Sequence, residues 1–304
     1  MSGGDTRAGS TRSGFAAIAG WTNVGKSTLL NRLVGEKIAA VADVPQTTRN
    51  RILGVRTFSG LSQAVFVDTP GFHRPKHALN RAMVDLARDS LTGVDVVLFL
   101  VDAARGLGPG DEQTAAALRK IAPARLAVLN KVDRVAPKVR LLPMMHTLVE
   151  GWGFPEAFPV SALTGEGCDL LLQRVLDLLP PGPFAFPDDT LTDQPERALV
   201  AEWIREKLLH HTRQEIPHAM AVVVDRWEET RADLTSIEAS IYVERESQKG
   251  IVIGKGGELL KRVGTEARGE IEHLLGRQVF LRLQVKVRLN WRDDERVLRE
   301  IGLA

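Results

Sequence analysis

The sequence predicts an α/β domain with a mostly parallel sheet covered by helices on both faces, followed by a smaller α+β domain. Three observations support this prediction. Residues 20–27 match the phosphate-loop pattern G-x-x-x-x-G-K-[ST] at every fixed position. Apolar runs alternate with helical segments up to residue 180. A proline-rich stretch then leads into a second region that has strands of its own and a G-x-x-G turn.

Composition narrows the class of protein. A chain of 304 residues is long enough for two domains, and its net charge of +2 means that any basic patch must be local. Cys168 is the only cysteine, which excludes an internal disulfide and fits a reducing cytoplasm. The seven histidines form no cluster with the spacing of zinc ligands, and no run approaches the ~20 apolar residues of a membrane span. We expect a soluble protein with a disordered tail at residues 1–14.

The phosphate loop is flanked by an expected strand, Phe15–Ala19, and an expected helix, Thr28–Val34. This order places backbone N–H groups and a helix N-terminus around one point, which suits a polyphosphate. Lys26 can reach the outer phosphates, and the Ser27 hydroxyl can bind Mg²⁺. The complete match disfavours an ordinary glycine turn. The residues expected around the phosphates are Gly20, Asn23, Val24, Gly25, Lys26, Ser27 and Thr28.

Polar motifs follow the strands of the first domain. Strands are expected at Ile52–Thr57, Ala64–Val67, Val94–Val101, Leu126–Leu129 and 158–160, and helices at Leu79–Leu91 and Glu112–Ile121. Motifs that begin at Gly20, Asp68, Asn130 and Ser161 each come directly after an apolar run. In an open α/β sheet the carboxyl ends of the strands line one crevice, so we expect these four motifs to share a ligand.

The motif Asn130-Lys131-Val132-Asp133 indicates which base binds. A carboxylate at Asp133 can accept hydrogen bonds from the N1–H and 2-amino groups of guanine, whereas adenine offers neither donor there. Asn130 can brace the loop, the stem of Lys131 can cover the ring, and Ser161 and Ala162 would supply backbone N–H for guanine O6. The expected ligands are therefore GTP and GDP. A charged turn at a strand end is the alternative for this motif alone.

The phosphate end of the crevice has its own candidates. Asp68 is placed to hold Mg²⁺ through water, and the Gly71 N–H to meet the γ-phosphate. A threonine of the segment 46–50, Thr48 rather than Thr47, would complete the metal shell when triphosphate is bound. Phe72 cannot orient water, so slow intrinsic hydrolysis is expected, with another group completing the site. Arg49 is a second candidate for that group, after Asn23, although it is expected to contact solvent or a partner. The residues expected to act in hydrolysis are Lys26, Thr48, Asp68, Gly71 and Asn23.

A linker at 181–196 is expected to separate the two domains, 15–180 and 197–304. In the second domain helices are expected at Arg197–His211 and Glu258–Leu275, and strands at Ala219–Val224, Ser236–Glu244 and Leu281–Leu289. A G-x-x-G turn at 254–257 lets a sugar–phosphate backbone approach closely. The last strand alternates apolar residues with the cations Arg282, Lys286 and Arg288, so one of its faces should be basic.

Cations near the turn suggest contacts with RNA phosphates. The alternative for Arg262 and Arg268 is a solvated charged face. The residues expected to bind RNA are Lys249, Ile253, Gly254, Lys255, Gly256, Gly257 and Lys261.

Taken together, the motifs GWTNVGKS, QTTRN, DTPGFHRPK, NKVD and VSALTGEG resemble those of the Era family of translation-factor-related GTPases. The second region resembles a type II KH domain in its G-x-x-G turn and in its order of helix, strand, strand, helix, helix, strand. The phosphate loop departs from the usual family sequence at Trp21 and Thr22. The resemblance covers 15–303 and implies a P-loop GTPase domain followed by a KH domain.

What the resemblance implies about function goes further than the motifs. It implies a GTPase that binds the 3′ region of small-subunit ribosomal RNA and acts in assembly of the 30S ribosomal subunit. A monomer is expected, located in the cytoplasm and with peripheral attachment at the inner face of the cell membrane. Related GTPases use an asparagine at the position of Asn23 to hold K⁺, and a plain brace of the loop is the alternative role. The rival functions are another P-loop phosphotransferase, or an RNA-binding protein with a structural nucleotide site.

Overall fold

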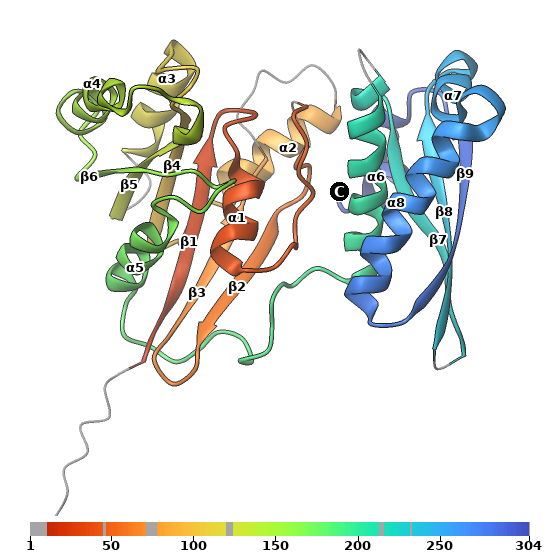
Figure 1. The fold of residues 1–304 in the computed structure, drawn as a ribbon, viewed down its shortest axis with the longest axis horizontal. Helices are drawn as coiled ribbons and strands as arrows, with labels where there is room; N and C mark the ends of the chain where they lie inside the picture. The colour runs from red at the N-terminus through yellow and green to blue at the C-terminus, as the bar shows by residue number, and fades with distance from the viewer. Residues whose placement is uncertain are drawn as a thin grey trace, which may run out of the picture. The chain divides into compact units, whose positions relative to one another are not determined.

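The computed structural model describes residues 11–44, 47–70, 78–119, 124–212, 216–231 and 233–303, and Figure 1 shows its elements. The chain divides into two compact units, each described here by itself. The first comprises 1–38, 51–72 and 87–193, and the second comprises 39–50, 73–86 and 194–304, as far as these ranges are described. Among the described helices, none combines the length and the apolar character that crossing a bilayer requires.

The first unit is built on a six-stranded sheet in the order β2-β3-β1-β4-β5-β6. Its strands are β1 (Arg12–Gly20), β2 (Ile52–Phe58), β3 (Ser62–Asp68), β4 (Val96–Asp102), β5 (Ala124–Asn130) and β6 (Glu156–Pro159). Only β2 runs antiparallel to its neighbour, so the prediction of a mostly parallel sheet is confirmed. The strand order reverses at β1, which is where an open sheet of this kind binds its ligand.

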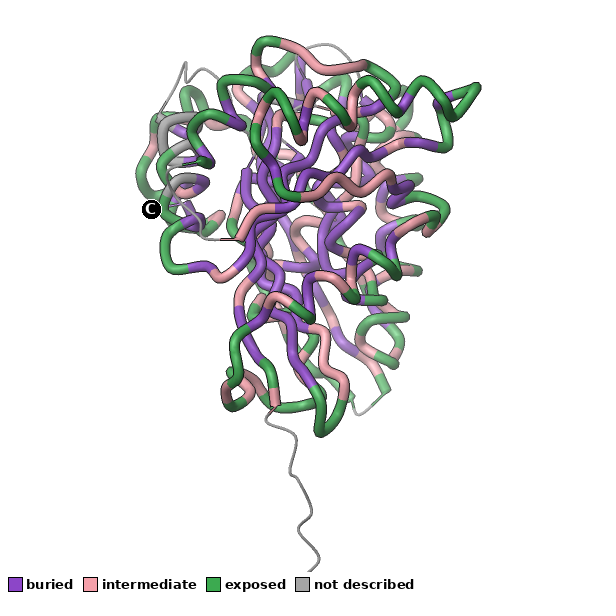
Figure 2. The backbone as a smooth tube through the Cα atoms, turned by 90° about the vertical axis from the view of Figure 1, so that its left-hand side faces the viewer, coloured by how far each residue is buried: buried purple, intermediate pink, exposed green. Residues whose placement is uncertain are grey.

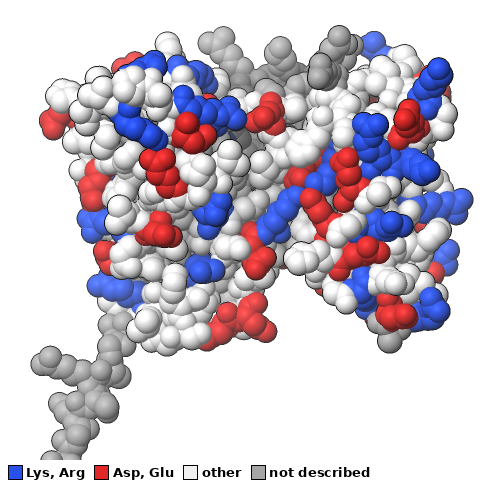
Figure 3. All heavy atoms as spheres, in the orientation of Figure 1, with Lys and Arg blue, Asp and Glu red and all other residues white. Residues whose placement is uncertain are grey.

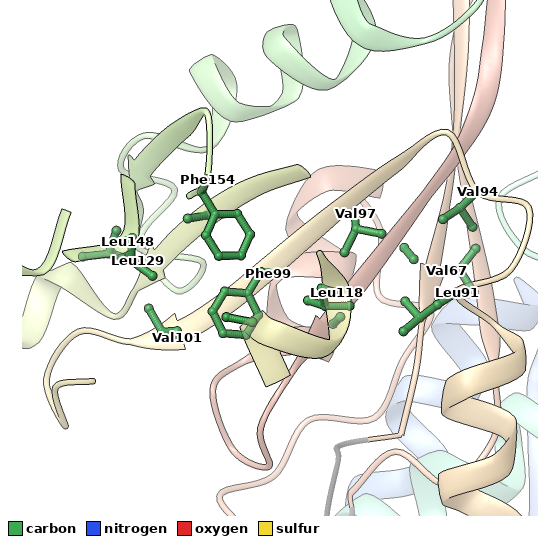
Figure 4. Packing of buried hydrophobic residues seen from close by; sticks show 14 of the residues in the cluster. Val67, Leu91, Val94, Val97, Phe99, Val101, Leu118, Leu129, Leu148 and Phe154 are labelled. Atoms are coloured by element: carbon green, nitrogen blue, oxygen red, sulfur yellow. The ribbon is translucent and has the colours of Figure 1, made fainter. Parts of the chain in front are cut away.

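Helices cover both faces of this sheet, as predicted. Those of the first unit are α1 (Lys26–Val34), α3 (Pro109–Leu118), α4 (Leu141–His146) and α5 (Cys168–Leu178), and α2 (Ala78–Asp89) is shared by both units. On the face of α3 and α4, the rings of Phe99 and Phe154 stack with centroids 5.2 Å apart, among Val97, Leu118 and Leu129 (Figure 4). Figure 2 shows that buried residues run along the strands while exposed ones lie on the loops and outer helix surfaces.

Two predicted boundaries of the first domain are wrong. Strand β1 begins at Arg12, inside the predicted tail, because residues 12–18 pair in register with β3. The predicted linker packs along the sheet edge instead of standing apart: Leu191 O accepts the Val55 N–H at 2.8 Å, and Phe186 O accepts the Gln63 amide at 2.8 Å. Covering edge strand β2 in this way satisfies its outward backbone groups. The C-terminal segment of the second unit therefore begins at Gln194.

The second unit is a three-stranded sheet covered by helices on one face. Its elements in chain order are α6 (Glu196–His211), β7 (Ala221–Arg231), β8 (Leu234–Val243), α7 (Glu246–Ile253), α8 (Glu258–Leu275), β9 (Gln278–Val287) and α9 (Glu295–Glu300). Strand β8 is central, antiparallel to β7 and parallel to β9. Alternate residues of β8, including Ile237 and Ile241, pack against Ile204 of α6 and Val263 of α8. The order of elements up to β9 is the one predicted for a type II KH domain.

The second unit also contains residues that the sequence placed in the first domain. Leu79 and Met83 of α2 are buried with Trp291, Val297 and Leu298 in one apolar cluster. The segment 39–50, as far as it is described, belongs to this unit as well, and its Ala42 and Val44 contact the main core of the unit. The prediction divided the chain at residue 180 into two continuous domains, so it missed that earlier segments belong to the second unit. Apolar contacts between residues distant in sequence leave no periodic pattern from which this could be predicted.

Candidate functional site

The phosphate loop joins β1 to α1 and is held by backbone contacts. Gly25 has φ 96°, and a Cβ atom there would lie 2.3 Å from the Asn130 amide nitrogen, so only glycine fits. The ammonium of Lys26 is buried and donates to Trp21 O at 2.9 Å and to Gly20 O at 3.3 Å. The ring of Trp21 lies close to Gly110 in the first turn of α3. The loop is thus braced despite its unusual residues Trp21 and Thr22.

Burial lowers the pKa of Lys26 to about 8, and the nearby Asp68 opposes this shift. A polyphosphate binds the charged form of Lys26, so affinity is full below that pKa and falls as pH rises through it. We expect the affinity for GDP to be nearly constant from about pH 6.5 to about pH 7.5 and to fall about tenfold by about pH 9. Equilibrium titration with fluorescent GDP measures this, and an affinity that stays flat to about pH 9 contradicts it.

Ser27 and Asp68 come together where α1 begins and β3 ends. The Ser27 hydroxyl donates to Asp68 Oδ2 at 2.8 Å, and both side chains are buried. A hydroxyl and a carboxylate are hard oxygen donors of the kind that Mg²⁺ prefers, and Mg²⁺ is commonly completed by phosphate and water rather than by a cage of protein ligands. The pair therefore fits the metal role predicted for it.

The base-recognition loops converge on Asn130, at the end of β5. Its amide nitrogen donates to Val24 O at 2.8 Å, and its Oδ1 accepts the Ala162 N–H at 2.9 Å. Asn130 thus ties the phosphate loop to the loop that follows β6, as predicted for a brace. The Ala162 N–H expected to read guanine O6 is therefore already hydrogen-bonded, and the base must share it or displace the amide.

Ser161 acts differently from the prediction. Its N–H donates to Glu166 O at 2.8 Å, which closes the loop 161–166, so this N–H does not point to the base. Its hydroxyl donates to Asp133 Oδ1 at 2.6 Å and fixes the exposed Asp133 carboxylate. Ser161 therefore contributes by orienting Asp133, and the prediction that it supplies a backbone N–H is wrong.

Lys131 joins the two ends of the site. Its ammonium donates to Asn23 O at 2.6 Å and pairs with Asp102 Oδ2 at 2.9 Å. Asn23 and Lys131 both adopt left-handed backbone conformations, with φ of 60° and 64°. Asp102 ends β4 and was missed in the sequence, although it follows an apolar strand just as Asp68 and Asn130 do.

The segment that carries Thr48 is held by the second unit. Thr48 is buried, and the neighbouring Thr47 hydroxyl donates to Val44 O at 2.6 Å within its own segment. Arg205 of α6 donates to Thr47 O. Thr48 lies in a different unit from Ser27 and Asp68, so its place in the metal shell stays a prediction. Gly71 and Phe72 lie outside the described residues.

Arg49 does not face solvent, so that part of the prediction is wrong. Its guanidinium is buried, donates to Met220 O at 2.9 Å, and lies over the ring of Trp291 with its carbon 5.6 Å from the centroid. Burial lowers the pKa of Arg49, and the nearby Arg205 lowers it further. Trp291 is fully buried and donates to Ala219 O at 2.9 Å. Both residues therefore anchor the segment 39–50 within the second unit.

The G-x-x-G turn lies between α7 and α8, as predicted. Gly254, Gly256 and Gly257 have φ of 75°, 63° and 81°. A Cβ at Gly254 would lie 2.8 Å from that of Leu259, whereas Gly256 has open space around it. Lys255 and Gly256 are exposed, so a nucleic-acid backbone can reach the turn.

The cations near this turn differ in their partners. Lys249 lies 3.8 Å from Glu246, and Ile253 is half-buried at the end of α7. Within the described part of the chain, neither Lys255 nor Lys261 forms an ion pair, and both are exposed. Figure 3 shows Lys and Arg side chains lying among Asp and Glu side chains on the helix-bearing face of this unit.

The basic face predicted for the last strand is largely neutralised. Strand β9 does place alternate apolar residues, Leu281, Leu283 and Val285, against the core. On the other side, however, the cations of β9 and the following Arg288 pair with acidic neighbours. Three pairs form: Arg282 with Glu238 at 3.7 Å, Lys286 with Asp225 at 3.6 Å, and Arg288 with Asp294 at 2.7 Å. The turn is thus the stronger candidate for binding phosphates.

The fold and the two sites define a P-loop GTPase with a type II KH domain at its C-terminal side. The profile of the 50S ribosome-binding GTPase family matches residues 15–131, and that of the KH domain matches residues 215–292. The chain is 51% identical to GTPase Era of Geobacter sp. (strain M21) over 296 residues, which cover 96% of this chain and 97% of that protein. It belongs to the Era family of GTPases. The alternative of a metabolic phosphotransferase is thereby set aside.

Other relatives support the same family assignment. GTPase Era of Alkaliphilus metalliredigens (strain QYMF) is 49% identical over 295 residues, covering 96% of this chain and 99% of that protein. The fold is similar to a crystal structure of Era in complex with MgGDPNP and nucleotides 1506–1542 of 16S ribosomal RNA, with a TM-score of 0.93 and 39% identity over 97% of this chain and 99% of that one. It is also similar to a variant of Aquifex aeolicus Era bound to GDP·AlF4⁻, with a TM-score of 0.92 and 39% identity over 97% and 100% of the two chains.

Proposed function

We propose that this Era-family GTPase is a switch that binds the 3′ region of small-subunit ribosomal RNA and acts in assembly of the 30S subunit. The observation that carries the proposal is the exposed turn at 254–257, whose Lys255 has no ion-pair partner in the described part of the chain. The similar Era structure with a fragment of 16S ribosomal RNA supports this choice of RNA.

At the nucleotide end, we assign each group by its geometry. Lys26 meets the outer phosphates, Asp133 reads the guanine edge, and Asn130 and Ser161 orient the loops around the base. Ser27 and Asp68 would hold Mg²⁺, which neutralises phosphate charge when bound. Thr48 of the segment 46–50, rather than Thr47, is proposed as a further ligand.

Three expectations about the whole protein stay predictions. A K⁺ ion at Asn23 should make GTP hydrolysis faster in KCl than in NaCl, and equal rates leave Asn23 as a brace of the loop. Gel filtration tests the expected monomer. Cell fractionation tests residence in the cytoplasm and peripheral attachment to the membrane.

The RNA-binding proposal is tested by replacing Lys255 and Gly256 with Asp. The change places two carboxylates against the RNA backbone, so affinity should fall at least tenfold, about 1.4 kcal/mol or more. Asp is among the residues that tolerate the left-handed backbone of Gly256, and its surroundings are open, so the fold should survive. Titration of a labelled 3′ fragment of 16S ribosomal RNA measures the change, and the variant should also lose affinity less steeply as salt rises.

A matched control lies on α8, the helix that follows the turn. Replacing Arg268 and Gly269 with Asp makes the same change of charge at exposed positions further along α8, and Gly269 also has open space around it. This control should retain most of the affinity for the RNA fragment. If both double variants lose affinity equally, or if the first binds normally while folded, the turn is not the RNA site.

A further inference from the structure

Arg32 contacts the base-recognition loop from a helix that carries no base motif. It lies in the last turn of α1, and its guanidinium donates to Leu163 O at 2.7 Å and to Ala162 O at 3.2 Å. These two residues follow Ser161 in the loop after β6. One side chain therefore joins the helix of the phosphate loop to the loop that would read the base.

The peptide groups of Ala162 are held from two sides. Asn130 accepts the Ala162 N–H at 2.9 Å, and Arg32 donates to the Ala162 carbonyl. Asn130 can set the direction of the N–H, but it does not contact the other end of the residue. The neighbouring Leu163 is 65% exposed, so its side chain adds little packing at this point of the loop, although Ser161 and Ala162 are buried. Arg32 supplies a contact at the Leu163 carbonyl that the Leu163 side chain does not supply by packing.

A cavity of about 320 Å³ lies beside this contact. Thr28, Asn31 and Arg32 of α1 line one part of it, and Ala162 and Leu163 line another. Arg32 is itself part of this lining, and its long side chain with two donors connects α1 to the loop. A planar guanidinium can hold two adjacent carbonyls in one geometry, which a lysine cannot do.

We propose that Arg32 is a positioning residue for guanine recognition, which sets the place of the Ala162 N–H opposite the O6 atom of the base. The inference rests on the proposed guanine site. Both of the donor contacts described are made to the protein, so Arg32 acts through Ala162 rather than on the phosphates. Small displacements of a recognition group weaken binding strongly, so loss of the contact should reduce base affinity without affecting the phosphate end.

The test replaces Arg32 with Met, which keeps an unbranched stem but removes the donors. Affinities for GDP, IDP and ADP are measured, since IDP keeps O6 and lacks the 2-amino group read by Asp133. We expect Arg32→Met to weaken GDP and IDP alike by about tenfold, leaving their ratio unchanged and reducing the preference for GDP over ADP. In GTP hydrolysis KM should rise while kcat at saturation stays constant. The GDP affinity of Arg32→Lys should lie between that of Arg32→Met and that of the native protein.

Arg119 gives a matched control in the same unit. It is also exposed, and its guanidinium donates to Trp152 O at 2.7 Å and to Gly151 O at 3.2 Å, away from the base motifs. Arg119→Met should leave affinity and base preference unchanged, and thermal unfolding checks that each variant is folded. An unchanged GDP affinity in folded Arg32→Met, or a loss of kcat at saturation, overturns the proposed role of Arg32 but not the proposed guanine site. If the native protein itself shows no preference for GDP over ADP, the proposed guanine site fails, and the role of Arg32 fails with it.

Discussion

Asp133→Asn is expected to change the base preference of the protein from guanine to xanthine. The carboxylate accepts from the N1–H and 2-amino groups of guanine, and an amide nitrogen facing the 2-amino group would place donor against donor. Xanthine has an oxygen acceptor at that position, so the asparagine amide can donate to it. We expect the affinity for GTP to fall about a thousandfold, about 4 kcal/mol, and the affinity for XTP to rise above it.

Competition of GTP, XTP and ATP against a fluorescent nucleotide measures this change. Asp169→Asn is the control, because it makes the same substitution at another exposed carboxylate, in the first turn of α5. That variant should keep the native preference. Tight GTP binding by Asp133→Asn, or ATP that competes as well as GTP with the native protein, contradicts the assignment of the base site.

Lys26→Ala should remove most of the affinity for nucleotide. The ammonium is buried beside the carbonyls of Gly20 and Trp21, where its charge interacts strongly with a bound polyphosphate. Its pKa of about 8 leaves it mainly protonated at neutral pH. We expect at least a hundredfold loss for GDP and GTP, about 2.8 kcal/mol, with hydrolysis falling below detection.

Competition of GDP and GTP against a fluorescent nucleotide measures this loss of affinity. Lys286→Ala is the control, because Lys286 is an exposed lysine of the second unit in a weak ion pair with Asp225. Thermal unfolding measures whether both variants are folded, which separates a lost phosphate contact from a lost fold. Native GDP affinity in folded Lys26→Ala would show that the phosphates bind elsewhere.

The site could be predicted from the sequence where it depends on local patterns. The local sequence of a phosphate loop determines its backbone conformation. The motifs led by Asp68 and Asn130 meet because parallel strands end at one edge of the sheet. Asp102 carried the same signal, a polar residue directly after an apolar strand, and should have been included with them. The KH turn was equally local, since its glycines lie within four residues.

What the sequence did not reveal depends on contacts between distant residues. Nothing in the segment 39–50 indicates that Arg49 would be buried against Trp291, more than 200 residues away. The alternation in the last strand correctly predicted its two faces, but its cations meet Glu238 and Asp225 only through pairing of strands within the sheet. Arg32 looks like an exposed helical residue, and only the backbone carbonyls it contacts give it a role.

The most direct test of the central claim is the binding of the native protein to a labelled 3′ fragment of small-subunit ribosomal RNA. It is measured with GDP and with a GTP analogue, beside a scrambled RNA of the same length and composition. We predict that the 3′ fragment binds at least tenfold more tightly than the scrambled RNA and that its affinity falls as salt rises. Equal affinity for the two RNAs with both nucleotides would contradict the account.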